Sequence, residues 1–218
     1  MKKSIFALVA CVVSAVSAAQ LFNGHDLSDW VSVADHGVTG GYTAEEPTWS
    51  VVDGAIRSTG TPFGYLRTKR ADFGDFKLRV EYRWWRKTAK PNSGVFVRLA
   101  RENACFLPTC YENQLCMGSA GDLLGLGGAE IEGVKPAKPY DPTKALSGIS
   151  KVLAAQPSPE KPFGEWNVLE VEAKGDQIVN RVNGVVRNTV KGLKVLKGAI
   201  ALQSEGGAVE FRNLTIEE

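Results

Sequence analysis

A short segment near the middle of the chain carries side chains suited to proton transfer and sugar binding. It reads Tyr111-Glu112-Asn113-Gln114-Leu115, and residues two apart in an extended strand lie on the same face. The Glu112 carboxylate and the Gln114 carboxamide are therefore expected to point the same way. A carboxylate can act as a general acid or base, and a carboxamide both donates and accepts hydrogen bonds. The segment predicts a site for a hydroxyl-rich ligand such as a sugar.

Other polar and aromatic side chains could complete such a site. Arg98 ends a predicted strand at 95–99, on the face shared by Gly94 and Phe96. Tryptophan rings could stack against a sugar ring. The further candidates for ligand binding are Gln203, Arg212, Trp84, Trp85 and Trp166. The alternative is a solvated outer sheet face on which Glu112 is paired with an arginine.

Several common chemistries have no signature in this sequence. It contains no H-E-x-x-H zinc motif, no G-x-S-x-G nucleophile elbow and no P-loop. The formal net charge is +2, and lysines and arginines form no cluster. We therefore expect no nucleic-acid partner.

The N-terminus has the pattern of a secretory signal peptide. Two lysines precede an apolar run at 5–16, and small residues follow it. Residues 1–19 are the predicted signal peptide, which leaves one domain at 20–218 in the periplasm or outside the cell. A lipidated Cys11 and a buried N-terminal helix are the alternatives. The apolar run is too short to span a membrane, which takes about 20 residues, and no later segment qualifies.

Export makes a disulfide plausible for the three remaining cysteines. A Cys105–Cys110 bridge would close a small loop around Pro108 and leave Cys116 unpaired. Free thiols are the main alternative. Zinc binding is a weaker one because no histidine lies nearby.

The predicted elements are short strands. Alternating or apolar runs occur at 76–84, 95–99, 167–173, 177–182, 185–190, 197–203 and 209–216. Asn183-Gly184 between two such runs predicts a tight hairpin. Long polar segments at 32–47 and 117–162 read as loops, with a short helix possible near 145–155. This rhythm favours a single all-β domain, a sandwich of two antiparallel sheets.

The order of several motifs resembles the 3-keto-disaccharide hydrolase domain family. The motifs are LFNGHDLSDW (21–30), WSVVDG (49–54), DFKL (75–78), NSGV (92–95), YENQ (111–114), GEWN (164–167), NG (183–184), LQ (202–203) and FRN (211–213). The resemblance implies a concanavalin-like jelly roll. It also implies cleavage of 3-keto-glycosides by elimination and hydration.

By that resemblance Glu112 would be the general base or a metal ligand, and Arg98 would stabilise an enolate oxygen. Gln114, Asn92 and Gln203 would orient the sugar, and a divalent metal ion is a conceivable cofactor. Met117 and Asn180 stand where many members have Asp and His. A sugar-binding module without activity, or an envelope interaction domain, therefore stays an alternative. The sequence fixes neither the sugar nor the oligomeric state.

Overall fold

The computed structural model describes residues 18–35, 47–89, 91–103, 105–144 and 146–218. All but the last two residues of the predicted signal peptide, including Cys11, lie outside this part of the chain. Within these ranges the regular secondary structure is β-strand, and the helix expected near 145–155 is absent from its described residues. No helix there is long and apolar enough to cross a membrane.

The strands are β1 (Ala19–Gln20), β2 (Trp30–Ala34), β3 (Trp49–Val52), β4 (Ala55–Ser58), β5 (Gly64–Thr68), β6 (Phe76–Arg86), β7 (Gly94–Arg101), β8 (Thr109–Gln114), β9 (Leu123–Leu126), β10 (Ser150–Val152), β11 (Asn167–Lys174), β12 (Gln177–Val182), β13 (Val185–Val190), β14 (Ala199–Ser204) and β15 (Ala208–Glu217). Short turns join several neighbouring strands, among them β3 to β4, β12 to β13 and β14 to β15.

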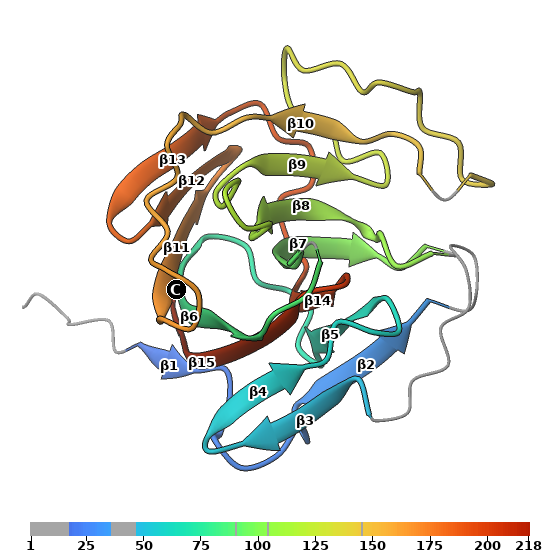
Figure 1. Ribbon diagram of the computed structural model, residues 1–218. Helices are drawn as coiled ribbons and strands as arrows, with labels where there is room; N and C mark the ends of the chain where they lie inside the picture. The colour runs from blue at the N-terminus through green and yellow to red at the C-terminus, as the bar shows by residue number, and fades with distance from the viewer. Residues whose placement is uncertain (1–17, 36–46, 90, 104, 145) are drawn as a thin grey trace, which may run out of the picture.

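These strands form two antiparallel sheets packed face to face (Figure 1). The first sheet has the order β13-β12-β11-β6-β15-β4-β3, and β1 pairs with β15. The second sheet has the order β10-β9-β8-β7-β14-β5-β2. Sequence neighbours such as β6 and β7 lie in different sheets, as in a jelly roll. The predicted two-sheet sandwich is confirmed.

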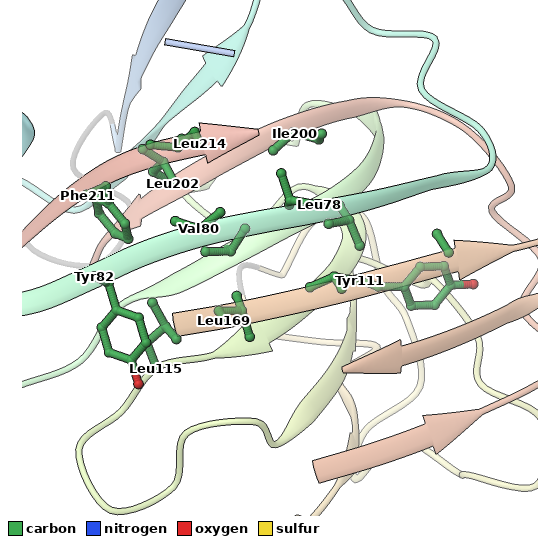
Figure 2. Close-up of a cluster of buried hydrophobic side chains, with 14 of the residues drawn as sticks. Leu78, Val80, Tyr82, Tyr111, Leu115, Leu169, Ile200, Leu202, Phe211 and Leu214 are labelled. Carbon is green, nitrogen blue, oxygen red and sulfur yellow. The ribbon is translucent and has the colours of Figure 1, made fainter. Parts of the chain in front are cut away.

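Alternation along each strand builds the core between the sheets. In β6 every second residue from Phe76 to Trp84 is buried, whereas Lys77 is exposed. Figure 2 shows such side chains from both sheets pointing toward one another: Leu78, Val80, Tyr82, Tyr111, Leu115, Leu169, Ile200, Leu202, Phe211 and Leu214. Burial of this apolar surface drives the two sheets together.

The turn between β12 and β13 has the predicted geometry. Asn183 has φ of 50° and Gly184 has φ of 80°, as the two central residues of a type I′ turn require. The Asn183 side chain also joins this turn to β11, because its Oδ1 accepts a hydrogen bond from Val168 N at 2.9 Å.

Candidate functional site

A row of polar side chains crosses the outer face of the second sheet, the face turned away from the first sheet. Tyr65 of β5 lies opposite Gln203 of β14, and Gly94 of β7 lies opposite Gln114 of β8. The pair beside them, Leu202 and Val95, packs in the core. Because faces alternate along a strand, Tyr65, Gln203, Gly94 and Gln114 form one row on the outer face, called the polar row below.

Glu112 joins the polar row at its centre. Its side chain lies over Gly94, where a Cβ atom would come within 2.9 Å of Glu112 Cγ and 3.0 Å of Glu112 Cδ. Gly94 thus provides the space in which the carboxyl group lies. Glu112 and Gln114 share one face, as the sequence predicts, and the structure brings Gln203 to the same place.

Several buried polar atoms here have no hydrogen-bond partner within the described part of the chain. They are Glu112 Oε1, Tyr65 Oη, Asn92 Oδ1 and both polar atoms of the Gln203 side chain. Tyr65 and Gln203 have no exposed surface, and Glu112 is 2% exposed. A buried polar group left unpaired costs about 1–3 kcal/mol. Such a concentration on one face indicates a binding site for a polar ligand.

A second carboxyl group, Glu205, follows β14 directly. Asn92 Nδ2 donates a hydrogen bond to Glu205 Oε2 at 2.7 Å, so these two residues form one wall of the site. Burial raises the pKa of Glu205 to about 7. Burial, reinforced by the charge of Glu205, raises the pKa of Glu112 well above its ordinary value. Two neighbouring acids thus both have raised pKa values, and acid–base pairs are built from carboxyl groups perturbed in this way.

Gln114 is oriented by its own strand end. Its Oε1 accepts hydrogen bonds from the backbone N–H groups of Leu115 and Cys116, both at 3.1 Å. Its carbonyl oxygen is therefore occupied, and its amide nitrogen is the group that can serve a ligand.

Arg98 does not lie on this face. The register of β7 is irregular between Val97 and Arg101, and Arg98 has φ of 53°. The alternation of faces is broken there, and the guanidinium donates to the Gly74 carbonyl from Nε at 3.2 Å and Nη2 at 3.1 Å. Arg98 is fully buried beside the loop that precedes β6. The prediction that it shares the face of Glu112 is wrong.

Trp166 and Arg212 also lie elsewhere, on the first sheet. Arg212 stacks on the Trp166 ring at 3.9 Å, and Arg83 covers the same ring at 4.6 Å. Arg212 Nε donates to Glu81 Oε2 at 2.8 Å. β15 and β6, which carry these arginines, belong to the first sheet. The two residues belong to a charged network there and are not in the candidate site.

The other tryptophans named from the sequence have structural positions too. Trp84 is buried in the core. Trp85 lies between Arg57 and Arg86, at 4.3 and 4.7 Å from the ring centroid. Neither ring lies on the outer face of the second sheet.

The predicted Cys105–Cys110 disulfide is wrong for this structure, which holds Cys105, Cys110 and Cys116 as thiols. Cys105 Sγ donates to the Leu107 carbonyl of its own loop at 3.7 Å. Cys110 is fully buried in β8. Phe106 and Leu107 pack with both cysteines on the apolar part of the outer face, so this loop is held by packing.

Asn180, which stands at the family's histidine position, belongs to the space between the sheets. Asn180 Nδ2 donates to Asn113 Oδ1 at 3.0 Å and to the Gly121 carbonyl at 3.1 Å. Its Oδ1 accepts from Asn188 N at 2.9 Å. This residue therefore joins the two sheets, and it faces away from Glu112. Met117 is 42% exposed.

The described residues gather no group of three His, Cys, Asp or Glu side chains that could hold a metal ion.

Sequence reasoning missed Tyr65, Glu205 and an ion pair between Asp122 and Lys151. Tyr65 was missed because a tyrosine in an apolar strand pattern is expected to pack in the core. Glu205 lies in the Ser204-Glu205-Gly206-Gly207 turn, two residues after Gln203, and this proximity was the available signal. Asp122 and Lys151 come together only through the pairing of β9 with β10.

Solved structures of known proteins share this fold. A proposed glycosyl hydrolase of Parabacteroides distasonis has a TM-score of 0.61 at 19% identity, over 92% of this chain and 93% of its own. The carbohydrate-binding module CBM66 of Bacillus subtilis has a TM-score of 0.60 at 11% identity, over 87% and 96%. The β-glucanase of Bacillus licheniformis has a TM-score of 0.56 at 12% identity, over 92% and 97%.

At these identities the similarity establishes the fold, a concanavalin-like jelly roll. A comparison with curated protein sequences finds no match. The family comparison is specific: the sequence pattern of the 3-keto-alpha-glucoside-1,2-lyase-like domain matches residues 17–217, and this protein belongs to that family.

Proposed function

We propose that this protein cleaves the glycosidic bond of 3-keto-glycosides, with Glu112 and Glu205 as its acid–base pair. Family membership supports a carbohydrate-related function. The observation that carries the proposal is the Glu112 carboxyl group, which lies in the space over Gly94 with Oε1 unpartnered. The charge of Glu205, whose own pKa is raised by burial to about 7, raises the pKa of Glu112 further.

The reaction needs one proton acceptor and one proton donor. A ketone at C3 acidifies the hydrogen on C2, so a base can remove it, and the electron pair of the C–H bond forms an enolate. The enolate re-forms the ketone and a C1–C2 double bond as the C1–O bond breaks. The leaving oxygen takes a proton from an acid. Water then adds its hydroxyl to C1 and its proton to C2, which gives net hydrolysis.

The surroundings of the two carboxyl groups suggest the two roles. Near neutral pH a substantial fraction of Glu205 is ionised, so it is the proton acceptor at C2. Glu112 is buried beside the charge of Glu205, which raises the pKa of Glu112 well above its ordinary value, and we assign it as the donor to the leaving oxygen. This assignment replaces the role of base that the family resemblance implied for Glu112. Tyr65 Oη and Asn92 Oδ1, which have no partner, and the Gln203 carboxamide supply hydrogen bonds to the sugar hydroxyls.

A sugar-binding role without catalysis is the second candidate. The unpaired atoms of Gln203 and Tyr65 would serve a bound sugar whether or not it reacts. The carbohydrate-binding module among the structural neighbours has such a role by its name.

One experiment separates the two candidates. Protein comprising 20–218 is incubated with 4-nitrophenyl 3-keto-glucoside and with its unoxidised parent, each with and without added divalent metal. We expect nitrophenol release from the keto sugar alone, and loss of release in Glu112→Gln and Glu205→Gln. Glu170→Gln, on the first sheet, is the control and should behave as wild type. Sugar binding by calorimetry without any release would support the binding module instead.

We also propose that the protein is exported and loses residues 1–19. N-terminal sequencing of protein recovered from the periplasm or medium of an expressing bacterium should begin near Gln20. A blocked terminus at Cys11 in the membrane fraction would indicate lipidation.

A further inference from the structure

We infer that Lys151 is the cationic group of this site, and that its ammonium binds the sugar oxygen that becomes negative when the proton on C2 is removed. The inference rests on the proposed function, because the C3 oxygen becomes negative only if the keto sugar loses its proton on C2. It also fills the role that the family resemblance implied for Arg98, whose guanidinium is bound at the Gly74 carbonyl.

The strand register places Lys151 on the face of Glu112. Lys151 of β10 lies opposite Leu124 of β9, and Leu124 lies opposite Glu112 of β8. The three residues therefore form one cross-strand row. Their side chains share a face, since directly paired residues point the same way. Two strand spacings separate the backbones of Lys151 and Glu112, about 10 Å, and the lysine side chain can cross that space.

A buried carboxylate holds the ammonium in position. Lys151 Nζ lies 2.9 Å from Asp122 Oδ2, and Asp122 Oδ1 accepts a hydrogen bond from Ala154 N at 2.8 Å. The Asp122 backbone carbonyl in turn accepts from Gln114 N at 2.9 Å. The ion pair is thus attached to the end of the polar row.

The ammonium keeps capacity for a ligand. A lysine carries three N–H donors, and Asp122 takes one of them. The Lys151 side chain is 41% exposed, against 3% for Asp122. Solvent can therefore leave and a sugar oxygen can take its place without breaking the ion pair.

Two other arginines that could serve this face form hydrogen bonds with protein groups instead. Arg98 is bound to the Gly74 carbonyl. Arg67, in the same cross-strand row beyond Ala201, donates to Glu102 Oε1 at 2.6 Å and to the Thr68 carbonyl at 3.1 Å. Electrostatics agree with the geometry, because the charge of Lys151 opposes the rise in the pKa of Glu112.

The test compares Lys151→Met and Lys151→Arg with Lys144→Met. Lys144 is a matched control, since it forms an ion pair with Asp141 at 3.1 Å but is 74% exposed and lies on a loop. With 4-nitrophenyl 3-keto-glucoside, Lys151→Met should lower kcat by about 100-fold, as loss of one oxyanion donor does. KM should change little, Lys151→Arg should recover part of the rate, and Lys144→Met should match wild type.

A second readout needs no turnover. Two charged side chains act on the Glu112 carboxyl, Glu205 after β14 and Lys151 on β10. The thiol of Cys110, on the same strand as Glu112, has its own pKa raised by burial and by the charge of Glu112. Carboxyl-¹³C NMR of glutamate-labelled protein should show a higher Glu112 pKa in Lys151→Met and no change in Lys144→Met. In the kinetics, the alkaline limb of the rate should move to higher pH in Lys151→Met.

The outcomes are distinguishable. If wild type releases nitrophenol and Lys151→Met keeps its kcat, the inference is overturned while the proposed function stands. If wild type releases none, the proposed function fails and the substrate role of Lys151 falls with it. An unchanged Glu112 pKa in Lys151→Met would overturn the placement of the Lys151 charge beside Glu112, whether or not wild type releases nitrophenol.

Discussion

The carboxyl group of Glu112 lies where any side chain at position 94 would be. Gly94 has no left-handed backbone angle, so its backbone alone does not call for glycine. The glycine is needed for space, because a Cβ atom at this position would come within 2.9 Å of Glu112 Cγ and 3.0 Å of Glu112 Cδ. The position of the proposed acid therefore depends on an atom that is absent from the neighbouring strand.

Gly94→Ala tests that dependence. The added methyl group would displace the Glu112 carboxyl group, and we expect turnover of a 3-keto-glucoside to fall by about 100-fold, since small misplacements of reacting groups have effects of that size. The melting temperature should change by only a few degrees, because the displaced atoms end a flexible side chain. Gly74→Ala is the control, since its Cβ would meet only the Leu196 carbonyl at 3.9 Å. Equal activity in the two variants would contradict the arrangement.

Glu112→Gln should change how stability depends on pH. The pKa of Glu112 is raised in the folded protein, so folding is favoured most while both folded and unfolded states hold the proton. As pH rises above about 4.5, the ordinary glutamate value, the unfolded state releases its proton first and stability falls. Glutamine cannot ionise, so the decline in stability from pH 5 to pH 8 should be smaller in the variant than in wild type. Urea unfolding at both pH values measures it, and parallel curves for the two proteins would contradict the prediction.

The sequence was sufficient for the fold and for the centre of the site. Alternation in β6 and the Asn183-Gly184 turn are local signals, and local rules of extended backbone govern them. Glu112 and Gln114 were placed together by the same rule. The rule of alternating faces failed at Arg98, because a bulge changes the face on which this side chain lies. The sequence Val95-Phe96-Val97-Arg98 contains no signal for a bulge.

Pairing between distant strands could not be read from the sequence either. Whether Trp166 and Arg212 share a sheet with Glu112 depends on which strands become neighbours. Alternation within a strand does not predict which strands pair. Lys151 and Asp122 were missed for the same reason. The Gly94 space was missed because it depends on a diagonal contact between two strands.

Arg98→Met should affect stability and leave the chemistry unchanged. The variant loses both hydrogen bonds to the Gly74 carbonyl, and we expect destabilisation by about 1–3 kcal/mol, the cost of leaving a buried acceptor unpaired. The rate of the folded variant and its pH profile should equal those of wild type. Chemical unfolding gives the first quantity and initial rates at low temperature give the second. A large loss of kcat in fully folded protein would return Arg98 to the site.

Trp166→Ala and Arg212→Ala should leave sugar turnover and binding within about twofold of wild type. Both residues lie on the first sheet, in contact with Arg83 and Glu81. Exposed ion pairs there contribute about 0–1 kcal/mol, so Arg212→Ala should also be mild in stability. Gln203→Ala is the informative comparison, since it removes a side chain from the polar row. A loss of affinity in Trp166→Ala greater than in Gln203→Ala would show that the sugar binds to the other sheet.

The three thiols should differ in reactivity. Burial raises the pKa of Cys105, Cys110 and Cys116, which lowers the thiolate fraction that reacts with an aromatic disulfide reagent. Cys116 is partly exposed, whereas Cys105 and Cys110 are buried. Native protein lacking residues 1–19 should therefore titrate one thiol slowly, and the same protein in guanidinium without reductant should titrate three. Cys116→Ser should abolish the native reaction and leave two thiols after unfolding. A total of one thiol in unfolded wild-type protein would mean that Cys105 and Cys110 are joined after all.

Since packing of Phe106 and Leu107 holds this loop, reductant should leave the melting temperature unchanged.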